Sequence, residues 1–166
     1  MEPWMTGTLI DLHPMQAALV YSLEHARQDI AHWTTGLADE ALWLGVGDIA
    51  PAAFHIRHIG GSVDRLLTYA AGRQLSEAQM QELQAEQQAG GETSRSELFE
   101  YFASKLQHAE ETVRGLDVTD LNALREIGRK RIPVPLGVLL THIAEHTQRH
   151  VGEAIITLKL ARQKLA

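Results

Sequence analysis

The stretch that decides the fold is Leu136–Leu165, LGVLLTHIAEHTQRHVGEAIITLKLARQKL, near the C-terminal end of the chain. Its apolar residues recur at three- and four-residue steps, as one face of an amphipathic helix requires. The same stretch carries histidines at i, i+4 and i+8, namely His142, His146 and His150. Because residues four apart stack on one side of a helix, we predict a long helix that presents a row of imidazoles.

Apolar periodicity predicts three further long helices upstream of this one. They run from about Leu9 to Trp33, from about Pro51 to Ala71, and from Ser94 or Ser96 to Gly115. Proline or serine at the start and glycine near the end are the usual helix boundary signals. Four long helices without a convincing sheet predict an all-α four-helix bundle, built as a single domain over residues 1–166.

Two long connections separate the later helices. Residues 73–94 are rich in Gln and Glu and contain Gly90-Gly91, so we expect a polar connection with helical parts after Ser76. Residues 116–135 read as irregular, with a short extended piece or hairpin at Gly128–Pro133. A short turn of helix is expected at Asp39–Trp43.

Composition limits the classes of partner. Lys and Arg total 15 and Asp and Glu total 21, and this net charge of −6 argues against nucleic-acid and anionic-membrane binding. No apolar run approaches the roughly 18–20 residues of a membrane span. The acidic N-terminal sequence lacks the pattern of a signal peptide, so we expect a cytoplasmic protein. There is no cysteine, and any thiol used in catalysis must therefore arrive with a substrate or cofactor.

The histidine row predicts a metal site between two helices. His142 and His150 each lie roughly 40° from His146 around the helix and are about 12 Å apart along its axis. Metal–nitrogen bonds measure only about 2.1 Å, so one ion would take His146 with one of these two neighbours. The third ligand would come from the second helix, where spacing alone does not choose between His55 and His58.

Two further features of the second helix carry expectations. Each glycine of Gly60-Gly61 costs about 1 kcal/mol relative to alanine in a helix, which predicts the close approach of another helix. Arg65 is expected in a structural ion pair or as a side chain that extends its charged end to solvent, with an anionic substrate as the alternative partner.

Two motifs resemble those of the DinB-like superfamily of metalloenzymes. They are FHIRHIGGSVDRLLTYAAGRQLS at residues 54–76 and HIAEHTQRHVGE at residues 142–153. The segment LADEALW at residues 37–43 also resembles the family's sequence before the second helix, and the resemblance extends from about Leu9 to Leu160. It implies a four-helix bundle that holds a divalent metal, often zinc or nickel, through three histidines. The positions that match the family's ligands are His58, His146 and His150, which leaves His55 and His142 as neighbours.

The resemblance also implies a chemistry. Related members include transferases and isomerases that use low-molecular-weight thiols such as mycothiol, bacillithiol or glutathione. Coordination to a divalent cation deprotonates a thiol, and the thiolate can attack an electrophilic small-molecule substrate. Two alternatives stay open: a hydrolase that uses metal-bound water, and a non-catalytic, stress-linked metal-binding protein. The fold is compatible with a homodimer, which no residue pattern demonstrates.

One residue departs from the family pattern. Many members read His-Arg-Gly-Gln after the second ligand of the last helix, whereas this chain reads His150-Val151-Gly152-Glu153. Glu153 is our candidate catalytic residue, because it lies one turn beyond His150 and roughly 20° from His146. It would orient a ligand or act as a base. The competing interpretation pairs it with Arg65 or leaves it in solvent.

Overall fold

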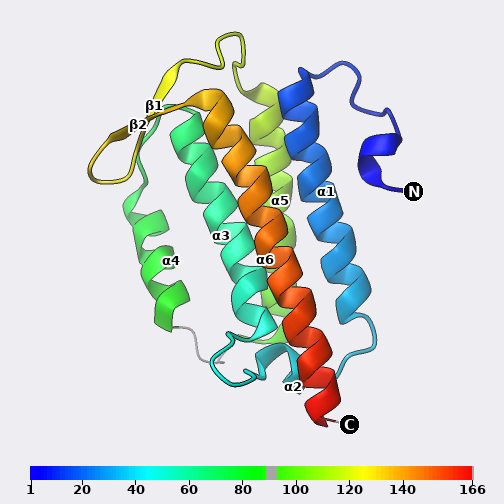
Figure 1. The fold of residues 1–166 in the computed structure, drawn as a ribbon. Helices are drawn as coiled ribbons and strands as arrows, with labels where there is room; N and C mark the ends of the chain where they lie inside the picture. Colours follow the sequence, from blue (N-terminus) through cyan, green and yellow to red (C-terminus); the bar gives the residue numbers. More distant parts are fainter. Residues whose placement is uncertain (89–92, 166) are drawn as a thin grey trace.

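The computed structural model describes residues 1–88 and 93–165 and is mainly helical (Figure 1). Its elements are η1 (Pro3–Met5), α1 (Pro14–Thr34), α2 (Asp39–Trp43), α3 (Ala52–Ala70), α4 (Glu77–Gln88), α5 (Arg95–Gly115), β1 (Leu124–Ile127), β2 (Ile132–Pro135) and α6 (Leu136–Leu165). Gly90 and Gly91 lie outside the described residues.

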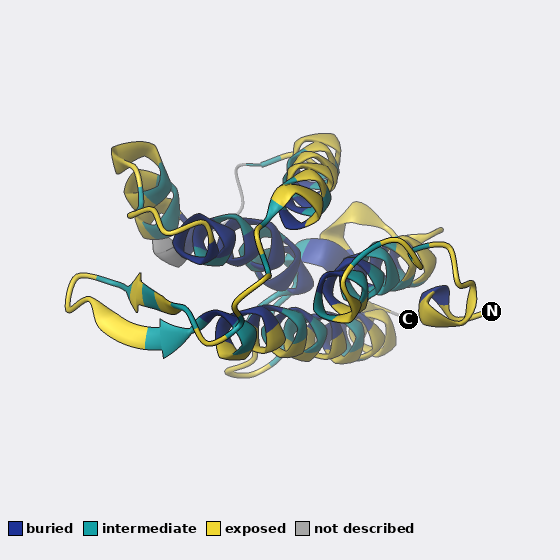
Figure 2. Cartoon of the chain, turned by 90° about the horizontal axis from the view of Figure 1, so that it is seen from above, coloured by how far each residue is buried: buried dark blue, intermediate teal, exposed yellow. Residues whose placement is uncertain are grey.

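Four long helices form the bundle that the sequence predicts. Helix α6 packs against both α1 and α3, and α5 closes the arrangement by packing against α3 and α1. Viewed along the bundle, the buried residues of these helices face inward and the exposed ones outward (Figure 2). Small aliphatic side chains dominate the core, including Leu19, Leu23, Ile30, Ile56, Ile59, Leu106, Leu140, Ile143 and Leu158. The prediction of an all-α bundle is confirmed.

The helix boundaries follow local chemistry. Helix α1 begins at Pro14 and not near Leu9, because proline occupies the first turn and the His13 ring accepts a hydrogen bond from the Met15 N–H at 3.2 Å. Helix α3 ends before Gly72, whose φ of 73° places it in the left-handed region that glycine adopts without strain. The expected end of this helix is therefore confirmed.

A helix and a two-stranded hairpin lie in the predicted connections. Helix α4 occupies the Gln- and Glu-rich segment after Ser76 and packs against α3, outside the bundle (Figure 1). Strands β1 and β2 pair antiparallel, with Leu124 opposite Pro135 and Ile127 opposite Ile132, and β2 leads directly into α6. Within the described residues, no helix has a stretch long and apolar enough to cross a membrane.

Candidate metal centre

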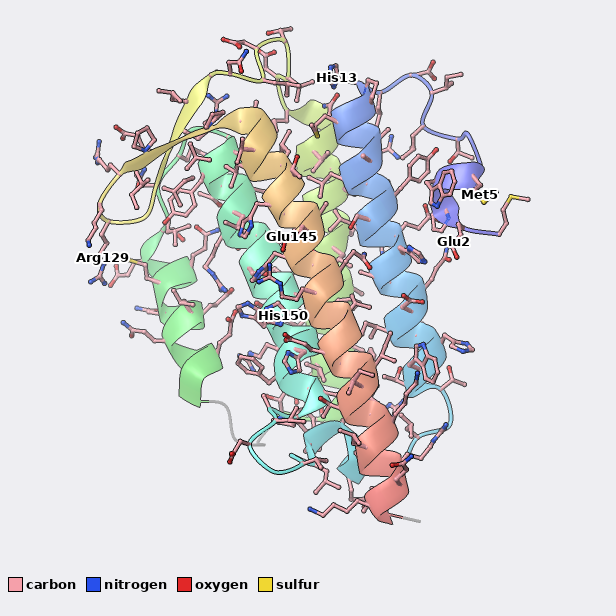
Figure 3. All side chains as sticks on the ribbon, in the orientation of Figure 1. Glu2, Met5, His13, Arg129, Glu145 and His150 are labelled. Carbon is pink, nitrogen blue, oxygen red and sulfur yellow. The ribbon has the colours of Figure 1, made fainter. Side chains whose placement is uncertain are left out.

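The candidate site lies where α3 and α6 pack side by side. Helix α3 supplies His58, and helix α6 supplies His146 and His150 from consecutive turns. His150 lies on the side of α6 that faces α3 (Figure 3). All three side chains are half-buried. The packing of two amphipathic helices thus brings together histidines that are 88 and 92 positions apart in the sequence.

The three imidazoles are close enough to share one ion. One ring nitrogen from each of His58, His146 and His150 lies within 4.8 Å of the other two. The Nε2 atoms of His58 and His146 are 3.1 Å apart. Two ligand atoms at about 2.1 Å from one tetrahedral ion would be about 3.4 Å apart, so little movement is needed to reach that geometry.

Carboxylates contact the outer nitrogens of two of these rings. The Nδ1 of His58 is 3.0 Å from Glu86 Oε2, and the Nδ1 of His150 is 2.9 Å from Glu153 Oε2. Since an ionised carboxylate only accepts hydrogen bonds, the His58–Glu86 hydrogen bond holds a proton on His58 Nδ1 and leaves its Nε2 with a lone pair, whereas the contact between His150 and Glu153 is a charge contact. Such a partner on the outer nitrogen is the usual environment of a metal-binding histidine.

His55 joins this arrangement from the inner side. Its Nδ1 lies 3.1 Å from Glu153 Oε2 and 3.0 Å from His150 Nδ1. Glu153 therefore lies within charge-contact distance of histidines on two helices. Together with Glu153 and His150, His55 forms a second group that could hold an ion.

Burial favours the neutral forms of His146 and His150. It lowers the pKa of His150 to about 4, and the neighbouring charges of His58 and His146 act in the same direction. Burial likewise lowers the pKa of His146, with His58 as the next cause. A neutral imidazole has the lone pair that a metal needs, so the site is ready for a cation at neutral pH.

Comparison with known proteins now identifies the family. The sequence profile of the DinB superfamily matches residues 22–154, which covers most of the chain and includes every histidine of the site. The chain belongs to the DinB superfamily. A search of curated proteins finds no match to this DinB-superfamily protein.

The structure brings together the three histidines that the resemblance implies as ligands, and their role as ligands stays a prediction. Among the histidines of the α6 row, His146 and His150 face His58, whereas His142 is exposed and contacts Glu145. The ring nitrogens of the group are chemically suited to a divalent ion, since imidazole binds both zinc and nickel. DinB membership and this three-histidine group together fit a metal-binding protein.

The structure also accounts for the two glycines of α3. A Cβ on Gly60 would lie 3.1 Å from the Tyr101 ring and 3.3 Å from Lys105 Cβ, both on α5. A Cβ on Gly61 would lie 2.0 Å from Glu86 Oε1 on α4. The predicted close approach of another helix is therefore confirmed at Gly60, while Gly61 makes room for a carboxylate.

Glu86 is the residue of this site that the sequence analysis missed. It is only 3% exposed and accepts hydrogen bonds from Arg65 at 2.7 and 3.0 Å. Arg65 is thus in the expected structural ion pair, and its partner is Glu86 rather than Glu153. The available signal was the three- and four-residue spacing of Gln79, Glu82 and Glu86, which places them on one face of a helix.

Proposed function

We propose that this protein is a divalent-metal-dependent enzyme that transfers a low-molecular-weight thiol to an electrophilic small molecule. The observation that carries the proposal is the convergence of His58, His146 and His150 from two packed helices. In this proposal the three rings bind the ion through Nε2. Zinc and nickel are the favoured metals because both accept imidazole ligands.

A three-ligand set supports a catalytic rather than a closed structural site. The His58 group contains three residues within the part of the chain that the structure describes, and structural zinc sites usually have four protein ligands. A bound ion would supply Lewis-acid chemistry that deprotonates an incoming thiol. The absence of cysteine from the chain is consistent with a thiol that comes from outside.

A depression beside the group offers room for the substrate. It has a volume of about 590 Å³, and its lining includes His55 and Glu153 from the site together with Ile49 and Ile156. Both isoleucines are about half exposed. We infer that an apolar part of the substrate lies against them while its reactive atom faces the histidines.

Glu153 has two proposed roles, and its contacts favour one of them. Its carboxylate lies at the Nδ1 atoms of His150 and His55, which favours the orienting role over that of a base. A homodimer and a cytoplasmic location also remain predictions from the sequence.

The first experiment measures metal content and thiol binding. We expect about one ion per chain in the wild type after loading with zinc, nickel or cobalt, and none in His146→Ala. The exposed His142→Ala, one turn earlier on α6, is the matched control and should retain the metal. Glutathione should then change the visible spectrum of the cobalt-loaded wild type, while its S-methyl derivative should not.

The outcomes separate the candidate functions. Metal binding without a response to thiols, but with hydrolysis of activated esters, would favour the hydrolytic alternative. Metal binding with neither response would favour a non-catalytic metal-binding protein. A wild type that binds none of the three metals would contradict the site itself.

A further inference from the structure

Helix α4 is held on the bundle mainly by polar contacts. Gln79 donates hydrogen bonds to Asp64 and Thr68 of α3 at 2.9 and 2.8 Å. One turn later, Glu82 accepts from Lys105 of α5 at 3.0 Å. These contacts attach the helix without reaching the histidine group.

The last turn of α4 contacts the site directly. Glu86 lies at 3.0 Å from His58 Nδ1, and both of its oxygens also bind the buried Arg65. A carboxylate with so little exposure needs a charged partner, and Arg65 supplies it. Arg65 balances the charge of this carboxylate, which accepts a hydrogen bond from His58 Nδ1 as well.

This contact sets which nitrogen of His58 faces the group. With the proton held on Nδ1 by Glu86, the lone pair is on Nε2, which lies 3.1 Å from His146 Nε2. The ring direction is fixed as well, since the hydrogen bond anchors one edge of the imidazole. Gly61 has no side chain that would displace the carboxylate from this position.

We propose that Glu86 is a positioning residue of the metal site, and that metal binding and the attachment of α4 to the bundle stabilise each other through the Glu86–His58 hydrogen bond. This inference rests on the metal site of the proposed function. Coupling between two events is reciprocal: if an anchored α4 raises metal affinity by some factor, bound metal raises the anchoring equilibrium by the same factor. Helix α4 would then respond to metal although none of its residues is in the three-histidine group.

The test compares two carboxylates of one helix. Zinc affinity would be measured by competition with a chromophoric chelator in the wild type, Glu86→Gln and Glu82→Gln. Loss of a hydrogen-bond partner behind a metal ligand typically lowers affinity about 10–100-fold, which we expect for Glu86→Gln. Glu82→Gln also loosens α4 but touches no histidine of the group, so its affinity should stay within about threefold of wild type.

Amide hydrogen exchange of residues 77–88 gives a second readout that is independent of activity. Zinc should slow exchange in this segment in the wild type and in Glu82→Gln, and should have no effect on it in Glu86→Gln. The wild-type measurement needs no substitution, so unchanged exchange of residues 77–88 on zinc binding would overturn the inference even if Glu86→Gln fails to fold.

Two results would overturn the inference while leaving the metal site intact. One is equal zinc affinity in Glu86→Gln and wild type. The other is an amide exchange rate in α4 of the wild type that zinc does not change. If the wild type binds no zinc at all, the proposed function fails instead. The two failures are therefore distinguishable in one set of measurements.

Discussion

At the scale of single residues, the histidines of α6 differ in their surroundings. His142, His146 and His150 occupy equivalent positions on successive turns of α6, yet His142 is exposed beside Glu145 while His150 is held by Glu153. Sequence spacing placed all three on one stripe. The neighbouring helix α3 distinguishes them, because only His146 and His150 have a ring nitrogen grouped with one of His58.

Gly61 has little room for a side chain. We predict that Gly61→Ala lowers the free energy of unfolding by about 1–3 kcal/mol, because the new methyl group would lie 2.0 Å from Glu86 Oε1 and 2.7 Å from an Arg65 nitrogen. The measurement is urea unfolding of the metal-free protein, followed by circular dichroism.

Gly152→Ala is the matched control for this substitution. Gly152 is also inside a helix, but a Cβ there would meet no atom within 4 Å. We expect no loss of stability, and a gain of up to about 1 kcal/mol from helix propensity. Similar effects of the two substitutions would contradict the packing argument at Gly61.

At the scale of elements, local sequence signals predict helix α5 better than helix α4. The start of α5 is predictable from the sequence, because serine is a favoured N-cap residue. In the structure Ser94 accepts a hydrogen bond from the Glu97 N–H, and the Glu97 side chain accepts one from the Ser94 N–H. Helix α4 was expected only as helical parts of a connection. Its attachment uses polar side chains, so it lacks the apolar stripe that predicts a packed helix.

The capping box of α5 supports a direct prediction. Ser94→Ala should lower the free energy of unfolding by about 1 kcal/mol, because the backbone N–H of Glu97 loses the Ser94 hydroxyl as its acceptor. Ser96→Ala is the control: this exposed serine is inside the first turn, and its loss should change stability by less than about 0.5 kcal/mol. Thermal unfolding of both variants measures the difference. Equal losses of stability in the two variants would contradict the assignment of Ser94 as the N-cap.

The polar attachment of α4 predicts sensitivity to alkaline pH. Burial by itself lowers the pKa of Lys105, but its hydrogen bond with Glu82 and the charge of Asp64 outweigh that effect, so the pKa is raised. The stabilisation from Lys105 is therefore complete below its unfolded pKa of about 10.5 and is lost as pH rises through the higher folded value.

Melting temperature measured against pH tests this sign. In the wild type it should fall as pH rises above about 10.5, and the fall should be shallower in Lys105→Met because that variant no longer loses the ion pairs. The exposed Lys130, in the turn between β1 and β2, provides the control, and Lys130→Met should keep the wild-type slope. A wild-type slope in Lys105→Met would show that α4 is attached by other contacts.

At the scale of the whole molecule, the histidine group joins two helices that are distant in sequence. Any ion bound there would connect α3 with α6, which already pack against each other. An ion that binds the folded state and not the unfolded state stabilises the folded state by mass action.

We therefore predict that zinc at 100 times its dissociation constant raises the free energy of unfolding by about 2.7 kcal/mol. For a chain of this size that corresponds to an increase in melting temperature of about 5–10 °C. His142→Ala should show the same increase and His146→Ala should show none, and removal of zinc by a chelator should reverse it. An increase that survives in His146→Ala would place the ion elsewhere.

The long helices, the all-α bundle and the histidine row follow from the sequence, because hydrophobic period and side-chain direction are properties of the local chain. The packing of the helices places His146 and His150 next to His58, leaves His142 exposed, and brings Glu86 from a polar connection to the Nδ1 of His58. The physical reason is that helix geometry sets angle and rise along one helix, whereas the distance between nitrogens on two helices depends on how their side chains pack.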